Sequence, residues 1–136
     1  MADTTAIASA TTAWTPRMRS ILRIAAGLLI LEHGTTKLLG FPPTNMSGIG
    51  FGSMAGVAGI FELVCGALVV LGLLTRPAAF LLSGMCAVGY WTVHAPMGFF
   101  PMLNHGETIA LYCFVFLYLA FAGAGPWSVD AMRGKA

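Results

Sequence analysis

The stretch MAGVAGIFELVCGALVVLGLL, residues 54–74, decides the fold of this chain. It contains one charged residue, Glu62, and about 20 apolar residues are enough for a helix to cross the ~30 Å hydrocarbon core of a bilayer. The whole chain shares this character, because 57% of its 136 residues are hydrophobic, 9% are charged and the mean hydropathy is +0.82. Such values exclude an ordinary soluble globular protein and indicate an integral membrane protein.

Further apolar segments lie on both sides of this stretch, and glycine, proline and polar residues separate them. The additional segments are residues 17–39, 77–95 and 105–123. Gly72 and Thr75-Arg76-Pro77 predict a tight hairpin between the second and third segments, which makes these two segments antiparallel neighbours. We therefore predict an all-α, polytopic membrane protein whose four transmembrane helices form an antiparallel bundle.

The same punctuation predicts a simple domain plan. Residues 1–14 form a flexible N-terminal tail, 15–130 form the membrane domain and 131–136 form a C-terminal tail. Thr15 and Pro16 predict the start of the first helix, as an N-cap and a proline in the first turn. Glycines inside the segments predict close helix packing, and they are Gly27, Gly56, Gly59, Gly66, Gly84 and Gly89.

The basic residues predict an orientation. Of the seven Lys and Arg residues, only Lys37 falls on the side opposite the termini, and these residues are enriched on the cytoplasmic side of membrane proteins. We therefore expect a multi-pass protein of the cell inner (plasma) membrane with both termini in the cytoplasm. The loops 40–53 and 96–104 are then external, and the second is apolar enough to lie in the membrane interface as a lid. Basic residues that serve orientation exclude nucleic acid as a partner.

Seven ionisable side chains lie within or at the mouths of the apolar segments. On the predicted topology they all gather near the outer end, and they are Glu32, His33, Lys37, Glu62, His94, His105 and Glu107. Such groups are expensive in a bilayer, by roughly 2.5 to 3.5 kcal/mol each at its centre, and they normally face a cavity or one another. A polar cluster on one side of the membrane is therefore the leading functional hypothesis.

Glu62 is the hardest member of this cluster to explain by packing, because its sequence neighbours are apolar. It is expected to act either as a neutral acid that carries protons or as half of an ion pair with Lys37 or a histidine, and plain interhelical contact is the alternative. Lys37 is equally well interpreted as an interfacial anchor or as a functional group. His33 is a candidate hydrogen-bond donor to a ligand carbonyl, and Glu32 a second proton carrier.

The remaining candidates have competing structural interpretations. Asn104-His105-Gly106-Glu107 has the spacing of a capping box, with Asn104 as the N-cap and Glu107 reaching back to it. His94 and His105 flank the outer loop and are expected to reach the mouth of the bundle. No metal-ligand spacing such as HxxxH or HExxH is present, so no metal site is predicted. The cysteines, Cys65, Cys86 and Cys113, are expected to be buried free thiols.

An ordered set of motifs over residues 17–130 resembles the DoxX family of small membrane proteins. The run Arg23 … Gly27-Leu28-Leu29 … His33-Gly34 … Lys37-Leu38-Leu39-Gly40-Phe41 is similar to its opening motif. Glu62 to Arg76 is similar to its E-x-x-x-G … L-G-x-x-T-R hairpin, and His94, Gly98-Phe99-Phe100 and Gly106-Glu107 follow in order. Residues 123–130 resemble the family's G-x-G-x-x-S-x-D ending. The resemblance implies a four-helix membrane bundle linked to redox chemistry, as in subunits of thiosulfate:quinone oxidoreductase.

From this resemblance and the polar cluster we expect a redox-associated subunit that binds a quinone or another small apolar ligand in an outer-half pocket. Glu32 and Glu62 would transfer protons, and His33, Lys37, His94, His105 and Glu107 would bind the ligand. No cofactor is expected to be covalently bound, so electrons would need a redox-active protein partner, and catalysis by the chain itself is left open. The alternatives are a non-enzymatic membrane scaffold that recruits a redox or stress-response enzyme, and a small-molecule or proton transporter. A homo-oligomer is also left open.

Overall fold

The structure is a computed structural model that describes residues 4–135, and over this range it contains helices and no strands. The elements in chain order are α1 (Thr4–Leu39), α2 (Met54–Leu71), α3 (Thr75–Gly89), a π-helical turn η1 (Tyr90–His94), a 3-10 turn η2 (Ala95–Met97), α4 (Glu107–Ala122) and α5 (Val129–Met132). The all-α prediction is therefore confirmed. The predicted hairpin is also present. Gly72, in the left-handed conformation, caps the end of α2, and α3 begins three residues after it.

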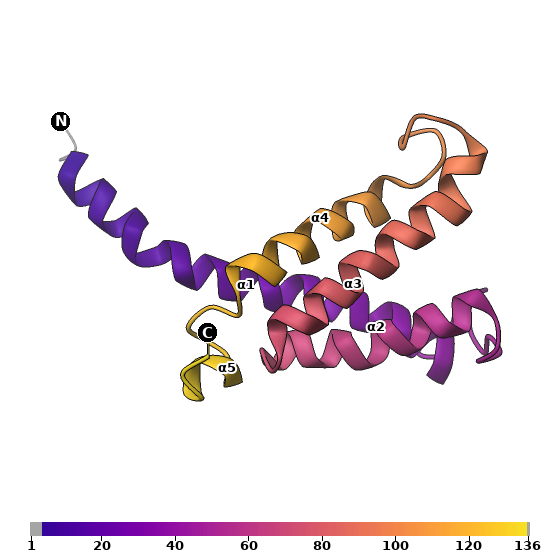
Figure 1. The fold of residues 1–136 in the computed structure, drawn as a ribbon, viewed down its shortest axis with the longest axis horizontal. Coiled ribbons are helices and arrows are strands. Elements are labelled where there is room, and N and C mark those ends of the chain that lie inside the picture. Colours follow the sequence, from indigo (N-terminus) through magenta and orange to yellow (C-terminus); the bar gives the residue numbers. More distant parts are fainter. Residues whose placement is uncertain (1–3, 136) are drawn as a thin grey trace.

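The four long helices pack in a chain of neighbours (Figure 1). α1 packs along α2, α2 along α3, and α3 along α4. α1 and α2 run in opposite directions, because Gly27 of α1 faces Val70 of α2 while Gly34 faces Leu63. A small core fills the space between the helices, and its most buried members are Val69, Ala79, Leu82, Cys86, Phe116 and Leu119.

Close packing of α1 and α2 depends on glycine at their crossing. A Cβ atom built on Gly34 would lie 2.5 Å from the backbone nitrogen of Leu63, and one on Gly66 would lie 3.1 Å from the Cα atom of Leu31. Small residues allow such approach where lipid offers no hydrophobic drive for association. The packing role predicted for Gly84 is wrong, because nothing lies within 4 Å of the Cβ position there.

The predicted start of the first helix at Thr15-Pro16 is wrong. α1 begins at Thr4, so most of the expected flexible N-terminal tail is helical and Pro16 lies inside the helix. The alanines in this segment favour the extension. The hydroxyls of Thr11, Thr12 and Thr15 donate to carbonyls four residues earlier, which is how threonine satisfies its hydroxyl inside a helix. Figure 1 shows this part of α1 projecting beyond the other helices.

The predicted capping box at the start of the fourth helix is also wrong. α4 begins at Glu107 itself, with Gly106 as the N-cap and no side-chain cap. The Asn104 carboxamide instead accepts from the Gly106 amide at 2.8 Å and donates to the Gly98 carbonyl at 2.8 Å, so it closes the preceding loop. At the other end of the chain, α5 continues past residue 130, where the C-terminal tail was predicted to begin.

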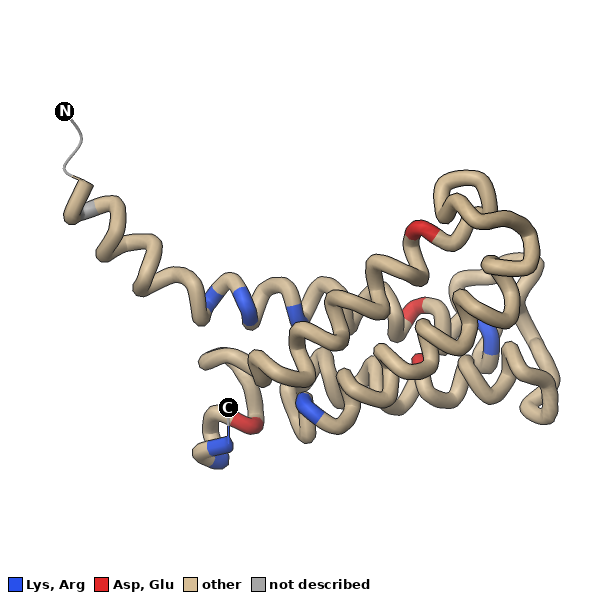
Figure 2. The backbone as a smooth tube through the Cα atoms, turned by 45° about the horizontal axis from the view of Figure 1, so that its top comes forward, with Lys and Arg blue, Asp and Glu red and all other residues tan. Residues whose placement is uncertain are grey.

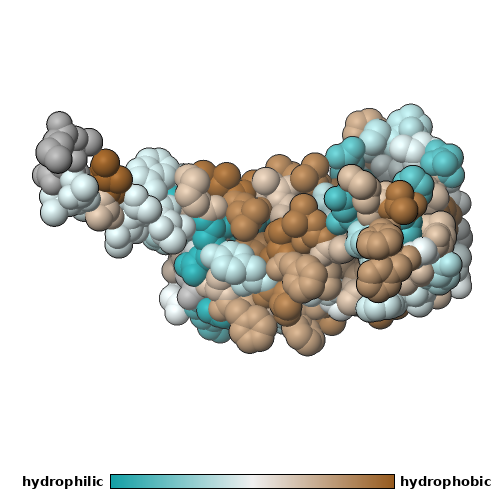
Figure 3. Space-filling view, turned by 90° about the horizontal axis from the view of Figure 1, so that it is seen from above, coloured by the Kyte–Doolittle hydropathy of each residue, from teal (hydrophilic) through white to brown (hydrophobic). Residues whose placement is uncertain are grey.

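The surface of the molecule suits a membrane. Met54–Leu71 and Thr75–Met97 are long and apolar enough to cross one, and only 33% and 28% of their most apolar windows are buried against other helices. Hydrophobic residues cover the middle of the face seen in Figure 3, and hydrophilic residues gather toward its ends. The outer loop predicted to be apolar exposes Phe99, Phe100, Met102 and Leu103. In water this much exposed apolar surface would be a liability, whereas lipid covers it without penalty.

Candidate functional site

A cavity of about 580 Å³ lies near the end of the molecule that holds the loops 40–53 and 96–104. Its wall combines residues of α1, α2, α3, η1 and α4 with the loop that follows α1. Six of the seven predicted site residues line it, and they are Glu32, His33, Lys37, Glu62, His94 and His105. Glu107 does not line it. It is the first residue of α4 and is exposed. The structure thus brings together all the candidates but one.

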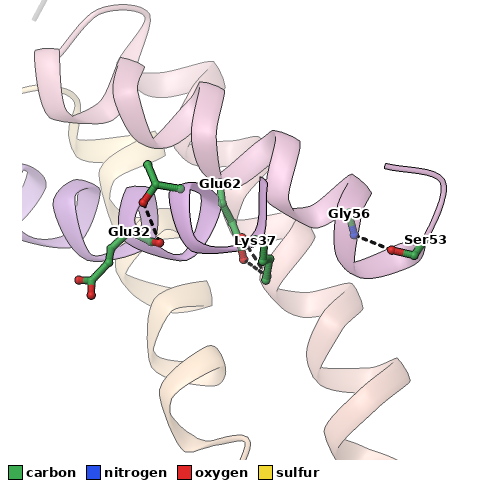
Figure 4. Close-up of polar contacts among 6 residues, drawn as sticks. Glu32, Lys37, Ser53, Gly56 and Glu62 are labelled. Carbon is green, nitrogen blue, oxygen red and sulfur yellow. Dashed lines mark hydrogen bonds and ion pairs between the residues drawn. The ribbon is translucent and has the colours of Figure 1, made fainter. Parts of the chain in front are cut away.

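An ion pair between α1 and α2 is the central feature of this cavity (Figure 4). The Lys37 ammonium donates to both carboxylate oxygens of Glu62, at 2.6 and 2.8 Å. Both side chains are largely buried, with exposed fractions of 13% for Lys37 and 6% for Glu62. An ammonium has three N–H groups, so Lys37 keeps one donor beyond the two that Glu62 accepts.

The backbone explains why this pair can form. Gly34 lies one turn before Lys37, and its missing Cβ lets α1 approach the backbone of α2 at Glu62 and Leu63. Gly59, one turn before Glu62 on α2, leaves room for the Cβ atom of Lys37 at 3.3 Å. The amides of Gly48 and Ile49 both donate to the Lys37 carbonyl and hold the loop after α1 against the helix end. Two glycines and a folded loop therefore place the cation over the carboxylate.

Glu32 occupies a different position from Glu62. Its carboxylate is exposed and points away from the ion pair in Figure 4. His33, the next residue, is also exposed, and its ring meets the Tyr112 ring edge-on with centroids 6.4 Å apart. The two carboxylates are therefore inequivalent, because one is buried with a cation and the other is open to the surroundings.

His94 has a defined tautomer in this arrangement. Its Nδ1 atom lies 2.9 Å from the Asn104 carbonyl oxygen, and a carbonyl can only accept, so Nδ1 must carry the proton. In the neutral ring, Nε2 is then an acceptor. The π-helical turn η1 presents this ring, which stacks on Tyr90 with centroids 6.4 Å apart. Nε2 of the neutral ring is thus suited to accept a hydrogen bond from a ligand.

The buried side chain of Asn104 holds the loop 96–104 together. This side chain is completely buried, and its two hydrogen bonds to Gly98 and Gly106 close the loop around it. His105, the following residue, takes a left-handed conformation with φ of 58°, which is uncommon for a residue other than glycine. A residue held in such a conformation next to a cavity is consistent with a positioned functional group.

The cavity also contains residues that the sequence did not single out. Tyr112, Thr108, Thr36, Asn45 and Cys86 line it together with apolar side chains. Tyr112 and Thr108 lie one turn apart on α4, so both face the cavity. Thr108 and Tyr112 follow His105 at three and seven residues, and this helical spacing was the signal that could have identified these two.

A second polar cluster lies at the opposite end of the helices. Arg23 is completely buried, and its guanidinium donates to the carbonyls of Val69, Val70, Ala124 and Trp127. The Asp130 carboxylate accepts from the amides of Leu74 and Thr75 at 3.0 and 2.9 Å, at the start of α3. Together these bonds fasten the segment before α5 to α1, α2 and α3.

Asp130 is suited to this position at a helix N-terminus. Burial raises the pKa of its carboxyl, but the amide hydrogen bonds from Thr75 and Leu74 and the charge of Arg133 outweigh burial and leave the pKa below its ordinary value. The carboxylate is therefore the stable form. This contact joins the hairpin motif around Thr75-Arg76 to the motif at residues 123–130.

Charge is distributed unequally between the two ends (Figure 2). Most of the acidic residues lie toward one end of the backbone and most of the basic residues toward the other. Glu32 and Glu62 belong to the cavity wall. Among residues 4–135, no three His, Cys, Asp or Glu side chains converge as metal ligands would. The ionisable and polar side chains in the cavity wall can donate and accept hydrogen bonds.

Comparison with known proteins agrees with this architecture. The family model DoxX matches residues 18–95. A protein of Haemophilus influenzae, described as uncharacterized, is 42% identical over 85% of this chain and 90% of its own length. An uncharacterized membrane protein of Mycobacterium tuberculosis is 30% identical over 84% of this chain and 80% of its own length. The inner membrane protein YphA of Escherichia coli is 30% identical over 85% of this chain and 89% of its own length. No solved structure matches the chain.

Proposed function

Because the chain belongs to the DoxX family of membrane proteins, we propose that it binds the head group of a quinone, or of a similar small redox-active molecule, in the cavity around Lys37 and Glu62. The observation that carries the proposal is a buried ion pair that forms part of the wall of a cavity of about 580 Å³, within a surface that is otherwise largely apolar. An ion pair that served only to join two helices would not need a cavity beside it.

The chemistry of a quinone fits the groups in this wall. A quinone carbonyl accepts hydrogen bonds, and the remaining N–H of Lys37 and a ring N–H of His33 are available donors. A quinol hydroxyl donates, and the free Nε2 of neutral His94 accepts. Two-electron oxidation of a quinol releases two protons, and the exposed carboxylate of Glu32 offers a route for them to the surroundings.

The proposal includes a membrane placement. Helices α1 to α4 cross the inner membrane as an antiparallel bundle with both termini in the cytoplasm, so the cavity lies in the outer half. α1 and α4 cross together with α2 and α3, and the support for this is that both expose large apolar side chains, Leu28, Leu29, Leu111 and Phe114 among them. Electron transfer over distance would require a redox-active protein partner.

Quinone binding can be tested on purified protein. Wild type, Glu62→Gln and Glu107→Gln are purified from membranes in mild detergent, and the quinone that accompanies each is quantified by mass spectrometry. We expect a stoichiometric quinone with wild type and Glu107→Gln, and its loss from Glu62→Gln. Glu107→Gln is the matched control, since it makes the same chemical change outside the cavity.

The result also separates this function from a scaffold. If no sample contains quinone, and added short-chain quinone fails to bind wild type in a titration, the proposal is wrong. Persistence of a co-purifying enzyme in that case would favour a scaffold that recruits it. Equal quinone in all three samples would show that the cavity around Glu62 does not hold it.

A further inference from the structure

A second hollow lies at the other end of the molecule, between the projecting part of α1 and the C-terminal half of α4. Its volume is about 670 Å³, and it lies apart from the proposed quinone cavity, sharing no residue with it. The side chains that matter here are Thr11, Trp14, Met18, Arg19, Leu22 and Tyr118. Most of this wall is apolar or aromatic, and Arg19 is its only charged member among the residues that line it.

Arg19 is incompletely used by the protein. One terminal nitrogen of its guanidinium donates to the Ala122 carbonyl at the end of α4, but its Nε atom is buried and has no hydrogen-bond partner within residues 4–135. A guanidinium has five N–H donors in a planar fork that matches the oxygens of a phosphate. Only one of the two terminal nitrogens is bonded to the protein, so the other can donate to a ligand oxygen in the groove that Arg19 lines.

The surroundings of the groove define the charge of that ligand. Most of the Lys and Arg residues lie toward this end of the backbone in Figure 2, and Arg17 and Arg19 are the two that stand at the groove. The one carboxylate among the described residues at this end, Asp130, is already held by the amides of α3. Such an excess of positive charge attracts an anion and disfavours a zwitterion or a cation.

The aromatic residues define where the ligand sits. Trp14 and Tyr118 are each 50% exposed, and such residues are enriched at the level of the lipid head groups. The Arg17 guanidinium lies over the Trp14 ring, 5.2 Å from its centroid, and so stands beside the groove. Met18 and Leu22 follow one and two turns after Trp14 toward the centre of the proposed membrane span, where an acyl chain would lie.

We infer that this groove binds one anionic phospholipid of the cytoplasmic leaflet. The phosphodiester oxygens accept from Arg19 at the end of α4, the head group lies beside Thr11 and Trp14, and an acyl chain follows Met18 and Leu22 toward Tyr118. The bound lipid fixes the projecting part of α1 relative to α4, which α1 otherwise touches little. The inference rests on the membrane placement proposed above and is independent of what the quinone cavity holds.

The test is lipid binding by native mass spectrometry. The protein is delipidated in detergent and titrated separately with phosphatidylglycerol and with phosphatidylethanolamine of the same acyl chains. We expect wild type to bind one phosphatidylglycerol with at least about fivefold preference, the effect of about one charge near a membrane surface. Arg19→Gln should lose this preference. Arg133→Gln should keep it, because it removes the same charge from the same end outside the groove.

A second variant separates binding from folding, since Arg19 also caps α4. Thr15→Trp fills the groove while leaving Arg19 and its bond to Ala122 in place. We expect it to lose the bound lipid at an unchanged melting temperature. Equal binding of the two lipids by wild type, or wild-type binding by Thr15→Trp, would overturn the inference.

The same samples separate this inference from the proposed function. Quinone content is measured in Thr15→Trp, and phosphatidylglycerol binding in Glu62→Gln. Quinone retained by wild type without lipid preference would overturn the lipid site alone, and lipid preference without quinone would overturn the quinone site alone.

Discussion

Lys37 and Glu62 form the buried ion pair in the cavity wall, and the contribution of this pair to stability can be tested directly. Lys37→Met removes the cation that contacts both oxygens of Glu62 and leaves a carboxylate that is 6% exposed without its partner. Breaking a buried pair in this way typically destabilises a protein by about 3 to 5 kcal/mol. We expect a loss of this size in unfolding by denaturant in detergent.

The double variant completes this test. Lys37→Met combined with Glu62→Leu removes both charges, so we expect it to be more stable than Lys37→Met alone. If the two single variants and the double variant lose stability additively, the two side chains are not coupled and the ion pair contributes little.

Asp130 gives the molecule a pH dependence whose sign can be worked out. Its pKa in the folded protein is lowered by the amide hydrogen bonds from Thr75 and Leu74, despite burial. The stability it contributes is therefore fully present above the unfolded pKa of about 3.9 and is lost as the pH falls through the lowered folded value. With a protease that is active at each pH, we expect the C-terminal segment of the wild type to be cleaved as fast as that of Asp130→Asn only in that acid range.

Asp130→Asn provides the control for this prediction. It cannot carry the charge, so at neutral pH its C-terminal segment should be cleaved faster than that of the wild type. Equal cleavage of the two proteins at neutral pH would contradict a role for Asp130 in holding the segment.

At the scale of elements, the contact between α1 and α2 rests on a glycine. Gly34→Ala places a Cβ atom 2.5 Å from the Leu63 backbone nitrogen, so the two helices must separate. Overpacking of this kind destabilises a protein by about 1 to 3 kcal/mol, and here it should also lengthen the Lys37–Glu62 contact. We expect Gly34→Ala to lower both the melting temperature and quinone retention.

Gly84→Ala is the matched control, because it makes the same substitution inside α3 where nothing lies within 4 Å of the new atom. Alanine is the better helix former by about 1 kcal/mol, so this variant should be as stable as the wild type or more so. Equal stability of the two variants would mean that the crossing of α1 and α2 tolerates a Cβ atom.

The elements also show how far sequence alone predicts this protein. Hydropathy and punctuation predicted the helices α2 and α3 and the hairpin between them, because apolar runs and a Gly with positive φ are local signals. The convergence of six of the seven candidates followed from placing polar groups at the same depth. Pro16 was misjudged because a proline that suits the first turn of a helix can also lie inside one, and the local sequence does not separate the two cases.

Contacts between distant segments were beyond such reasoning. Arg23 looked like an orientation signal, yet its guanidinium is buried among carbonyls of α2 and of the segment before α5. Asn104 looked like a helix cap, yet it closes a loop. In both cases the side chain bonds to backbone groups that only the tertiary fold brings near, so the spacing of residues in the sequence does not predict these hydrogen bonds.

For the whole molecule, the unequal ends imply a direction across the membrane. The cavity, with Glu32, Glu62 and His94, lies at one end, and the buried Arg23 and the docked Asp130 lie at the other. A proton released by a ligand in the cavity would leave on the side opposite the termini. The direction of any such proton release therefore depends on which end faces the cytoplasm.

Cysteine labelling of intact cells tests this orientation. Pro43→Cys places a thiol in the loop after α1 and Lys135→Cys places one near the C-terminus, and both positions are exposed. Cys65 and Cys86 are buried and Cys113 is partly so, and the unsubstituted protein measures their background labelling. Because basic residues favour the cytoplasmic side, we expect a membrane-impermeant maleimide to label Pro43→Cys in intact cells and Lys135→Cys only after lysis. The reverse pattern would turn the molecule over, so that protons from the cavity would enter the cytoplasm. Labelling of both sites before lysis would contradict the three membrane crossings by α2, α3 and α4 that the proposal places between them.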